Sequence, residues 1–173
     1  MRSQLNARAL VDTATMTAPL PYPDSAFAAL ETFGLLWRWT SPTHAVFPPE
    51  VMASIRPFTS TAARTLSAEA LTRVALPLVT GDASVACGES VPEQAISRWL
   101  MPLCIRSSAW TALSWNTELA VLIPWSVFTE RWSDFCYPAS DDVIIWQPGH
   151  EWTLVYEHDE WFQYFQHLAA RVA

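Results

Sequence analysis

The 173-residue chain contains no lysine, and its ten basic residues are all arginine. They are outnumbered by 17 acidic residues, which leaves a formal net charge of −7 at pH 7. Proteins that bind nucleic acid or anionic membrane surfaces need clustered Lys and Arg to meet the phosphate groups. The few scattered arginines therefore argue against nucleic acid and membranes as partners.

Glycine is also scarce, with four residues in the whole chain. No G-x-x-x-x-G-K-[ST], G-x-G-x-x-G or G-x-S-x-G string occurs. The loops that cradle nucleotide phosphates or present an activated serine are therefore missing. This disfavours nucleotide kinases, Rossmann dehydrogenases and serine hydrolases of the nucleophile-elbow type, and we expect no cofactor.

The three cysteines, Cys87, Cys104 and Cys136, are widely spaced and form no C-x-x-C pair. Such a pattern is typical of buried free thiols in a reducing compartment rather than of disulfides or a zinc site. The longest apolar run, 119–128, is about half the roughly 20 residues of a membrane span. Residues 1–16 lack the apolar stretch of a secretory signal, so we expect a cytoplasmic protein.

Hydrophobic residues make up 51% of the chain and charged residues 16%, a composition typical of a folded globular protein. The length corresponds to one domain. The first 20 residues show no sustained periodicity and run into a proline-rich segment. We therefore expect a loose arm over 1–20 and a single domain over 21–173.

Hydrophobic periodicity predicts the elements of secondary structure. The expected helices cover 24–33, 49–55, 60–75, 90–100, 124–134 and 159–171. The expected strands cover 35–39, 107–115, 118–123, 143–146 and 152–156, and 77–91 is expected to be irregular. Because the strands cluster late and join as hairpins, we predict an α+β fold. Its mostly antiparallel sheet would carry the helices on one face.

Charge is distributed unevenly along the chain. Residues 1–117 hold eight acidic and eight basic residues, whereas 118–173 hold nine acidic and two basic residues. Two explanations remain open for acids such as Asp159 and Glu160. They complement the dipole at the start of a helix, or they form a negative patch for a basic partner, and both can hold at once.

Tryptophan is abundant, with ten residues, which is more than a core of this size needs. Tryptophan and tyrosine are enriched at interface hot spots, so we expect one or two tryptophans to be partly exposed. In the predicted C-terminal helix, Trp161, Phe165 and Leu168 would share a buried stripe. The predicted partner-binding residues are Asp134, Asp141, Asp142, Glu157, Asp159, Glu160, Trp161 and Tyr164.

The chain offers weak candidates for catalysis and for metal binding. His158 and His167 would face opposite sides of a helix, because nine residues rotate it by about 900°. Cys136 follows a predicted helix C-terminus, where the dipole disfavours the thiolate that catalysis requires. We therefore predict no metal site and no catalytic residue. A small hydrolase-like enzyme with a motif-free site around Cys136, His150 and His158 stays the alternative.

Four strings in the C-terminal part of the chain carry a resemblance, within about residues 107–165. They are Trp125-Ser126-Val127-Phe128, Trp132-Ser133-Asp134-Phe135-Cys136-Tyr137-Pro138, Ser140-Asp141-Asp142-Val143 and Tyr156-Glu157-His158-Asp159-Glu160. In them the chain resembles small, uncharacterised bacterial proteins, some of which are similar to immunity proteins of polymorphic or contact-dependent toxin systems. The resemblance implies a compact acidic protein that neutralises a toxin by binding it, and it carries over no catalytic residue.

An acidic inhibitor suits a toxin that attacks nucleic acid, because many such toxins are basic in order to bind phosphate. Opposite charge speeds their association, and buried aromatic anchors slow their dissociation. The leading prediction is thus a non-enzymatic immunity protein with a basic protein partner. An acidic nucleic-acid mimic that regulates a nucleic-acid-binding protein is a further alternative, which differs only in the identity of the partner.

Overall fold

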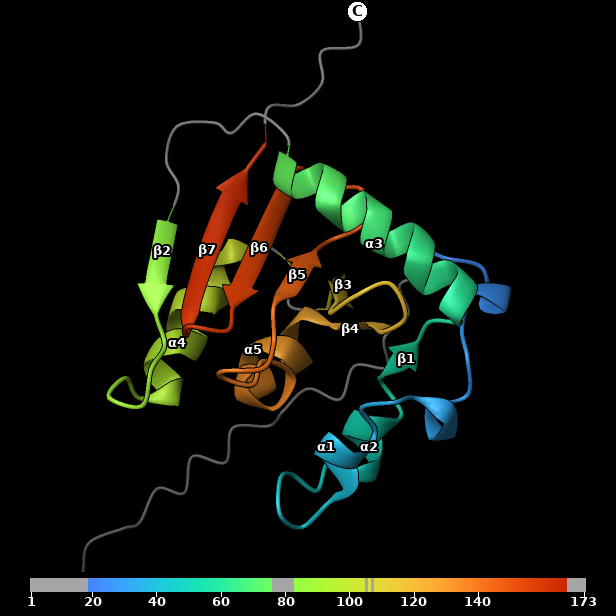
Figure 1. Ribbon diagram of the computed structural model, residues 1–173, viewed down its shortest axis with the longest axis horizontal. Coiled ribbons are helices and arrows are strands. Elements are labelled where there is room, and N and C mark those ends of the chain that lie inside the picture. Colours follow the sequence, from blue (N-terminus) through green and yellow to red (C-terminus); the bar gives the residue numbers. More distant parts are fainter. Residues whose placement is uncertain (1–18, 76–82, 105, 107, 168–173) are drawn as a thin grey trace, which may run out of the picture.

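A seven-stranded antiparallel sheet forms the centre of the computed structural model, which describes residues 19–75, 83–104, 106 and 108–167. The strand order is β1-β4-β3-β5-β6-β7-β2 (Figure 1). The strands are β1 (Arg56–Pro57), β2 (Ala83–Ala86), β3 (Trp110–Ser114), β4 (Ala120–Pro124), β5 (Val143–Trp146), β6 (Trp152–Glu157) and β7 (Trp161–Gln166). The α-helices are α1 (Trp37–Thr40), α2 (Pro49–Met52), α3 (Ser60–Ala75), α4 (Glu93–Leu100) and α5 (Trp125–Phe135), with 3-10 turns at Asp24–Ala26, Leu30–Thr32 and Met101–Leu103. The predicted α+β class and antiparallel sheet are confirmed.

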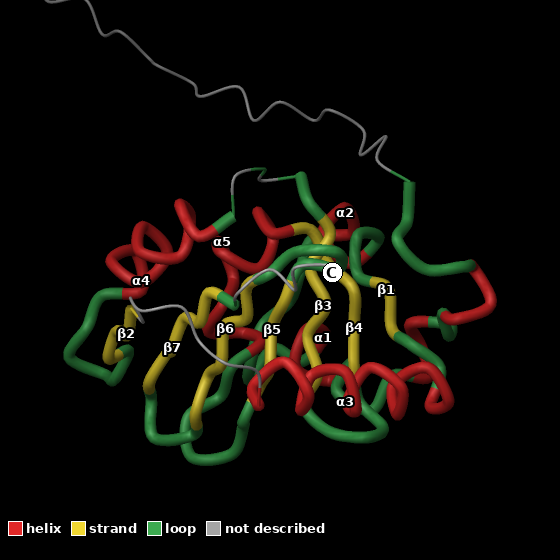
Figure 2. Tube along the Cα trace, turned by 90° about the horizontal axis from the view of Figure 1, so that it is seen from above, coloured by secondary structure: helices red, strands yellow, loops and turns green. Residues whose placement is uncertain are grey.

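Helices cover both faces of the sheet, which corrects the prediction that they lie on one face. Figure 2 shows α3 on one side and α4 and α5 on the other. Alternate residues of a strand point to opposite faces. Accordingly, Leu113 and Val121 belong to the core cluster that contains Phe128 of α5, whereas Ala112 and Leu122 belong to the cluster beneath α3. β3 and β4 can be buried on both faces because a helix packs on each.

Strong local signals produced the elements that the sequence predicts best. Helix α3 spans Ser60–Ala75 and strand β5 spans Val143–Trp146, as expected. Pro124 precedes the first residue of α5, where its fixed φ suits a helix start. In the β3–β4 hairpin the side-chain oxygen of Asn116 accepts bonds from the backbone N–H groups of Glu118 and Leu119. This Asx arrangement holds the turn together.

The predicted closing helix over 159–171 is wrong, because Trp161–Gln166 form strand β7 between β6 and β2. Its burial alternates at the start, with Trp161 exposed and Phe162 buried. The segment is rich in aromatic residues, which favour strands. Pairing with two neighbouring strands decided the outcome over the helical spacing of Trp161 and Phe165. The remainder of the predicted helix, from residue 168, lies outside the described residues.

Three other predictions fail in short segments. The expected strand at 35–39 is instead one helical turn, α1, and the expected helix at 24–33 is two separate 3-10 turns. The segment 77–91, expected to be irregular, contains β2, which pairs with β7 across about 80 residues of chain. Such long-range pairing leaves no trace in a local pattern. The predicted arm over 1–20 falls almost entirely outside the described residues.

Candidate functional site

Acidic side chains from four segments of the chain gather at one end of the sheet. Because neighbouring strands are antiparallel, the ends of β2 and β6 lie beside the starts of β5 and β7 (Figure 1). Backbone hydrogen bonds join the segments: the N–H of Ala139 donates to the oxygen of His158, and that of Cys87 to Glu160, both at 2.8 Å. We call this region the acidic end. Its carboxylates are Glu89, Glu93, Asp134, Asp142, Glu157, Asp159 and Glu160.

The β6–β7 turn is built by the three residues between the strand-paired Glu157 and Trp161. Glu160 has φ of +70°, in the left-handed region that glycine favours. Its N–H donates to the oxygen of Glu157 at 2.9 Å. This is the geometry of a three-residue hairpin with a left-handed last residue. The turn exposes Asp159 and half-exposes Glu157 and Glu160.

An exposed ion pair links the loop before β5 to this turn. One carboxylate oxygen of Asp142 lies 2.8 Å from Nδ1 of His158 and accepts the backbone N–H of the same residue at 3.0 Å. The hydrogen bond to His158 lowers the pKa of Asp142, and the same bond raises the pKa of His158. The two groups therefore hold opposite charges over a wider pH range than isolated side chains would.

A pocket of about 300 Å³ opens at the acidic end. The side chains of Glu89, Glu93 and Glu160 line it together with Trp132 and Tyr156. Analysis of the sequence missed Glu89 and Glu93, because they lie in the charge-balanced first part of the chain. Only the pairing of β2 with β7 brings them to the acids of the last third.

Asp134 lies half-buried near this pocket, on α5. Burial raises its pKa, while the charge of Arg131 lowers it and the charge of Glu93 raises it further. The presence of Glu93 in that environment places Asp134 with the acidic set. The sequence-predicted residues that lie together at this end are thus Asp134, Asp142, Glu157, Asp159 and Glu160.

Asp141 does not belong to the surface, which corrects its prediction as a partner-binding residue. Its side chain is 5% exposed and pairs with Arg38 of α1, which is 6% exposed. Two hydrogen bonds of 2.5 and 2.8 Å join the guanidinium to both carboxylate oxygens. Asp141 also accepts the N–H of Tyr137 and the hydroxyl of Ser140. With its oxygens occupied inside the fold, Asp141 holds α1 against the loop before β5.

Tyr164 also departs from the predicted partner-binding set. It lies in the interior of β7 and lines a different pocket, away from the acidic end. Its ring stacks on Trp152 with 6.2 Å between centroids, and its hydroxyl donates to Gln166 at 2.8 Å. Its side chain therefore belongs to the opposite end of the β6–β7 hairpin.

Two tryptophans are exposed, as the tryptophan content predicts. Trp161, which follows the β6–β7 turn, is 43% exposed, and Trp37 is 45% exposed. Trp37 packs against Tyr137, with 6.3 Å between ring centroids, and Tyr137 starts the loop that ends at Asp142. Exposed indoles therefore flank the acidic end on two sides. Trp161 is among the partner-binding residues predicted from the sequence. Trp37 is not, because the segment 35–39 was expected to form a strand.

The described geometry does not assemble Cys136, His150 and His158 into one site. His150 precedes the first residue of β6, and His158 follows its last residue. The length of this six-residue strand, about 20 Å, separates the two side chains. Cys136 is buried at 1% exposure as the C-cap of α5, and burial raises the pKa of its thiol well above the ordinary value. Burial likewise raises the pKa of Cys87 to about 12, with a further contribution from the charge of Glu160. Neither environment favours a reactive thiolate.

A larger pocket of about 820 Å³ lies at the opposite end of β6 and β7. No group of three or more His, Cys, Asp or Glu side chains with metal-binding geometry occurs among the described residues. In the described part of the chain, no helix combines the length and apolarity that a membrane crossing requires.

Comparison of the chain with protein-family models, with curated proteins and with solved structures finds no match.

Proposed function

We propose that this chain is a non-enzymatic binding protein whose acidic end docks a basic protein, in the manner of a bacterial immunity protein that neutralises its toxin. The observation that carries the proposal is the convergence of carboxylates from four chain segments on one end of the molecule. Most of these groups are exposed rather than buried in ion pairs. Buried free cysteines favour a reducing location, which we take to be the cytoplasm.

The acidic end has the parts that a fast and tight protein interface needs. A concentrated charge of one sign raises association rates about 10- to 1,000-fold through steering. Exposed indoles supply the anchors that slow dissociation. Trp161 lines a shallow hollow with Glu157 and Asp159, whereas Glu89, Glu93 and Glu160 line a separate pocket at the same end of the molecule.

The test replaces two exposed acids that have no side-chain hydrogen bond in the described structure, Glu89 and Asp159. The variant Glu89→Arg/Asp159→Arg and the wild type would each be used to capture proteins from a lysate of the source organism. We expect the wild type to retain one stoichiometric basic protein that high salt releases. The double variant should lose it, and with the purified partner its association rate should fall at least tenfold.

The matched control is Asp24→Arg/Glu151→Arg, which changes the net charge equally. Asp24 lies near β1 at the far edge of the sheet, and Glu151 lies at the other end of β6. This control should capture the partner with unchanged kinetics. Equal capture by both double variants would overturn the interface at the acidic end. A wild type that retains no protein at either salt would overturn the binding function and return attention to enzymatic alternatives.

The identity of the captured protein separates the remaining possibilities. A toxin domain supports the immunity function, whereas a nucleic-acid-binding regulator supports the acidic mimic. Competition between this chain and a DNA fragment for the captured protein measures the second case directly.

A further inference from the structure

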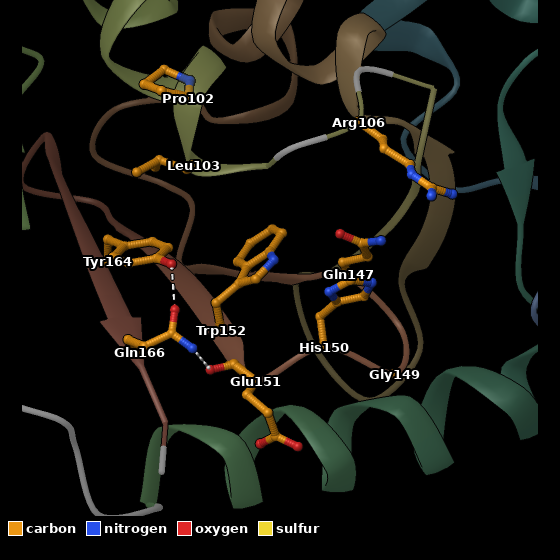
Figure 3. Close-up of a pocket in the computed structure, with 10 residues that line it drawn as sticks. All are labelled: Pro102, Leu103, Arg106, Gln147, Gly149, His150, Glu151, Trp152, Tyr164 and Gln166. Atoms are coloured by element: carbon orange, nitrogen blue, oxygen red, sulfur yellow. Dashed lines mark hydrogen bonds between the residues drawn. The ribbon is translucent and has the colours of Figure 1, made fainter. Parts of the chain in front are cut away.

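A wide pocket lies between the segment after α4 and the far end of the β6–β7 hairpin. Its volume of about 820 Å³ is within the range of small-molecule sites. Figure 3 shows Trp152 in its middle, with Tyr164 on one side and Gln147 and His150 on the other. The described residues that line it are Pro102, Leu103, Arg106, Gln147, Gly149, His150, Glu151, Trp152, Tyr164 and Gln166.

Trp152 lines this pocket with an indole N–H that donates to no other described residue. Its side chain is 5% exposed, held by Trp125 at 5.4 Å and Tyr164 at 6.2 Å between ring centroids. Its indole N–H makes no hydrogen bond to another described residue, and its nitrogen is not among the fully buried side-chain atoms that lack a partner. This donor is therefore open to the pocket, where it can meet an acceptor that enters from outside.

Two further side chains add donors to the same pocket. The amide oxygen of Gln147 accepts the thiol of Cys104 at 3.2 Å, which leaves its amide N–H groups for the pocket. Arg106 lines the same pocket and is exposed. A guanidinium presents paired N–H groups that match the two oxygens of a carboxylate.

Acceptors within the pocket are largely occupied. The amide oxygen of Gln166 accepts the hydroxyl of Tyr164 at 2.8 Å, and its amide nitrogen donates to the backbone oxygen of Glu151 at 2.9 Å. Figure 3 shows the carboxylate of Glu151 directed away from Trp152, toward α3. Free donors and one cation therefore dominate the open part of the pocket, in a protein whose net charge is −7.

We propose that this pocket binds a small organic carboxylate that carries a flat ring. The carboxylate would accept hydrogen bonds from Arg106, Gln147 and the indole N–H of Trp152. The ring would lie against the apolar wall that Leu103 and the Tyr164 ring provide. This site is separate from the acidic end, because the two lie at opposite ends of β6 and β7, and it stands independently of the proposed protein interface.

The experiment titrates the full-length protein with sodium benzoate and follows the indole 1H–15N signals by NMR. The Trp152 signal is identified by its absence in Trp152→Phe. We expect a saturable shift of that signal, with a Kd on the order of 10 mM or tighter for a ligand of this size. Indole-3-carboxylate should bind more tightly than benzoate, because its larger ring covers more of the apolar wall.

Three comparisons decide the proposal. Arg106→Gln should weaken benzoate binding at least tenfold, whereas Arg98→Gln, the same change at an exposed position of α4, should leave it unchanged. Benzamide, the neutral isostere, should bind at least tenfold more weakly than benzoate. No saturable Trp152 shift, equal binding of benzamide, or an unaffected Arg106→Gln variant would each overturn the site. If sodium sulfate produces the same shift with the same Kd, a general anion site replaces the carboxylate site.

Discussion

Asp141 and Asp142 are adjacent in the sequence, yet their side chains lie in different environments and form different ion pairs. Asp141 is buried in a bidentate pair with Arg38, and the Arg38 guanidinium also lies 4.2 Å from the centre of the Tyr137 ring. Asp142 is exposed and pairs with His158. Burial of a charge is tolerated only when a partner and hydrogen bonds compensate it. The two residues therefore separate a structural role from a surface role within one dipeptide.

Replacing Asp141 with alanine should strongly destabilise the fold, because it leaves the buried guanidinium of Arg38 without a counter-charge. We expect the free energy of unfolding to fall by about 3–5 kcal/mol. Asp142→Ala, its neighbour, should change stability little, since exposed pairs contribute little. Urea unfolding followed by tryptophan fluorescence measures both variants. Equal stability of the two variants would contradict the buried pair.

His158 should titrate above the ordinary histidine value of 6.5, because the hydrogen bond and charge of Asp142 stabilise its protonated form. The stabilisation from the pair is fully present below pH 6.5 and is lost as the pH rises through the raised pKa of His158. The same stabilisation also requires a charged Asp142. It is present above pH 3.8, the ordinary pKa of an aspartate, and is lost as the pH falls through the lowered pKa of Asp142.

NMR titration of the imidazole signals tests this pair. In Asp142→Asn the pKa of His158 should fall back toward 6.5, compared with the same signal in the wild type. An unchanged pKa of His158 in this variant would show that the pair does not form in solution.

At the scale of elements, β7 shows how pairing overrides a local pattern. Its residues Trp161 and Phe165 have helical spacing, but as a strand the segment joins β6 on one side and β2 on the other. A strand between two neighbours satisfies its backbone groups on both sides. That gain outweighs any preference of the isolated segment, and it places Trp161 on the surface and Phe162 in the core.

Alanine substitutions in β7 distinguish the strand from a helix. Phe162 is fully buried against Phe128, Trp132 and Tyr156, so Phe162→Ala should cost about 3–5 kcal/mol of stability. Trp161→Ala, one residue earlier, should cost under about 1 kcal/mol because its side chain is 43% exposed. Denaturant unfolding gives both values. The reverse order would indicate the buried helical stripe that the spacing of Trp161 suggests.

At the scale of the whole molecule, one antiparallel sheet separates two kinds of surface. The ends of β2 and β6 meet the starts of β5 and β7, and this end gathers the carboxylates. The opposite end of the β6–β7 hairpin holds the donor-lined pocket around Trp152. A rigid sheet with a helical layer on each face keeps these two surfaces apart. The proposed protein partner at one end would therefore leave the other end open.

The sequence by itself determined the α+β class, the antiparallel hairpins and helices such as α3 and α5, because these depend on local periodicity and turn residues. It also located most of the acidic end, since Glu157, Asp159 and Glu160 lie close together along the chain. Only the tertiary structure decided that Asp141 is buried by Arg38, that Glu89 and Glu93 join the acidic end, and that β7 is a strand. Each of these depends on contacts between residues distant in the sequence, and the free energy of such contacts is set by packing and pairing partners that no local pattern records.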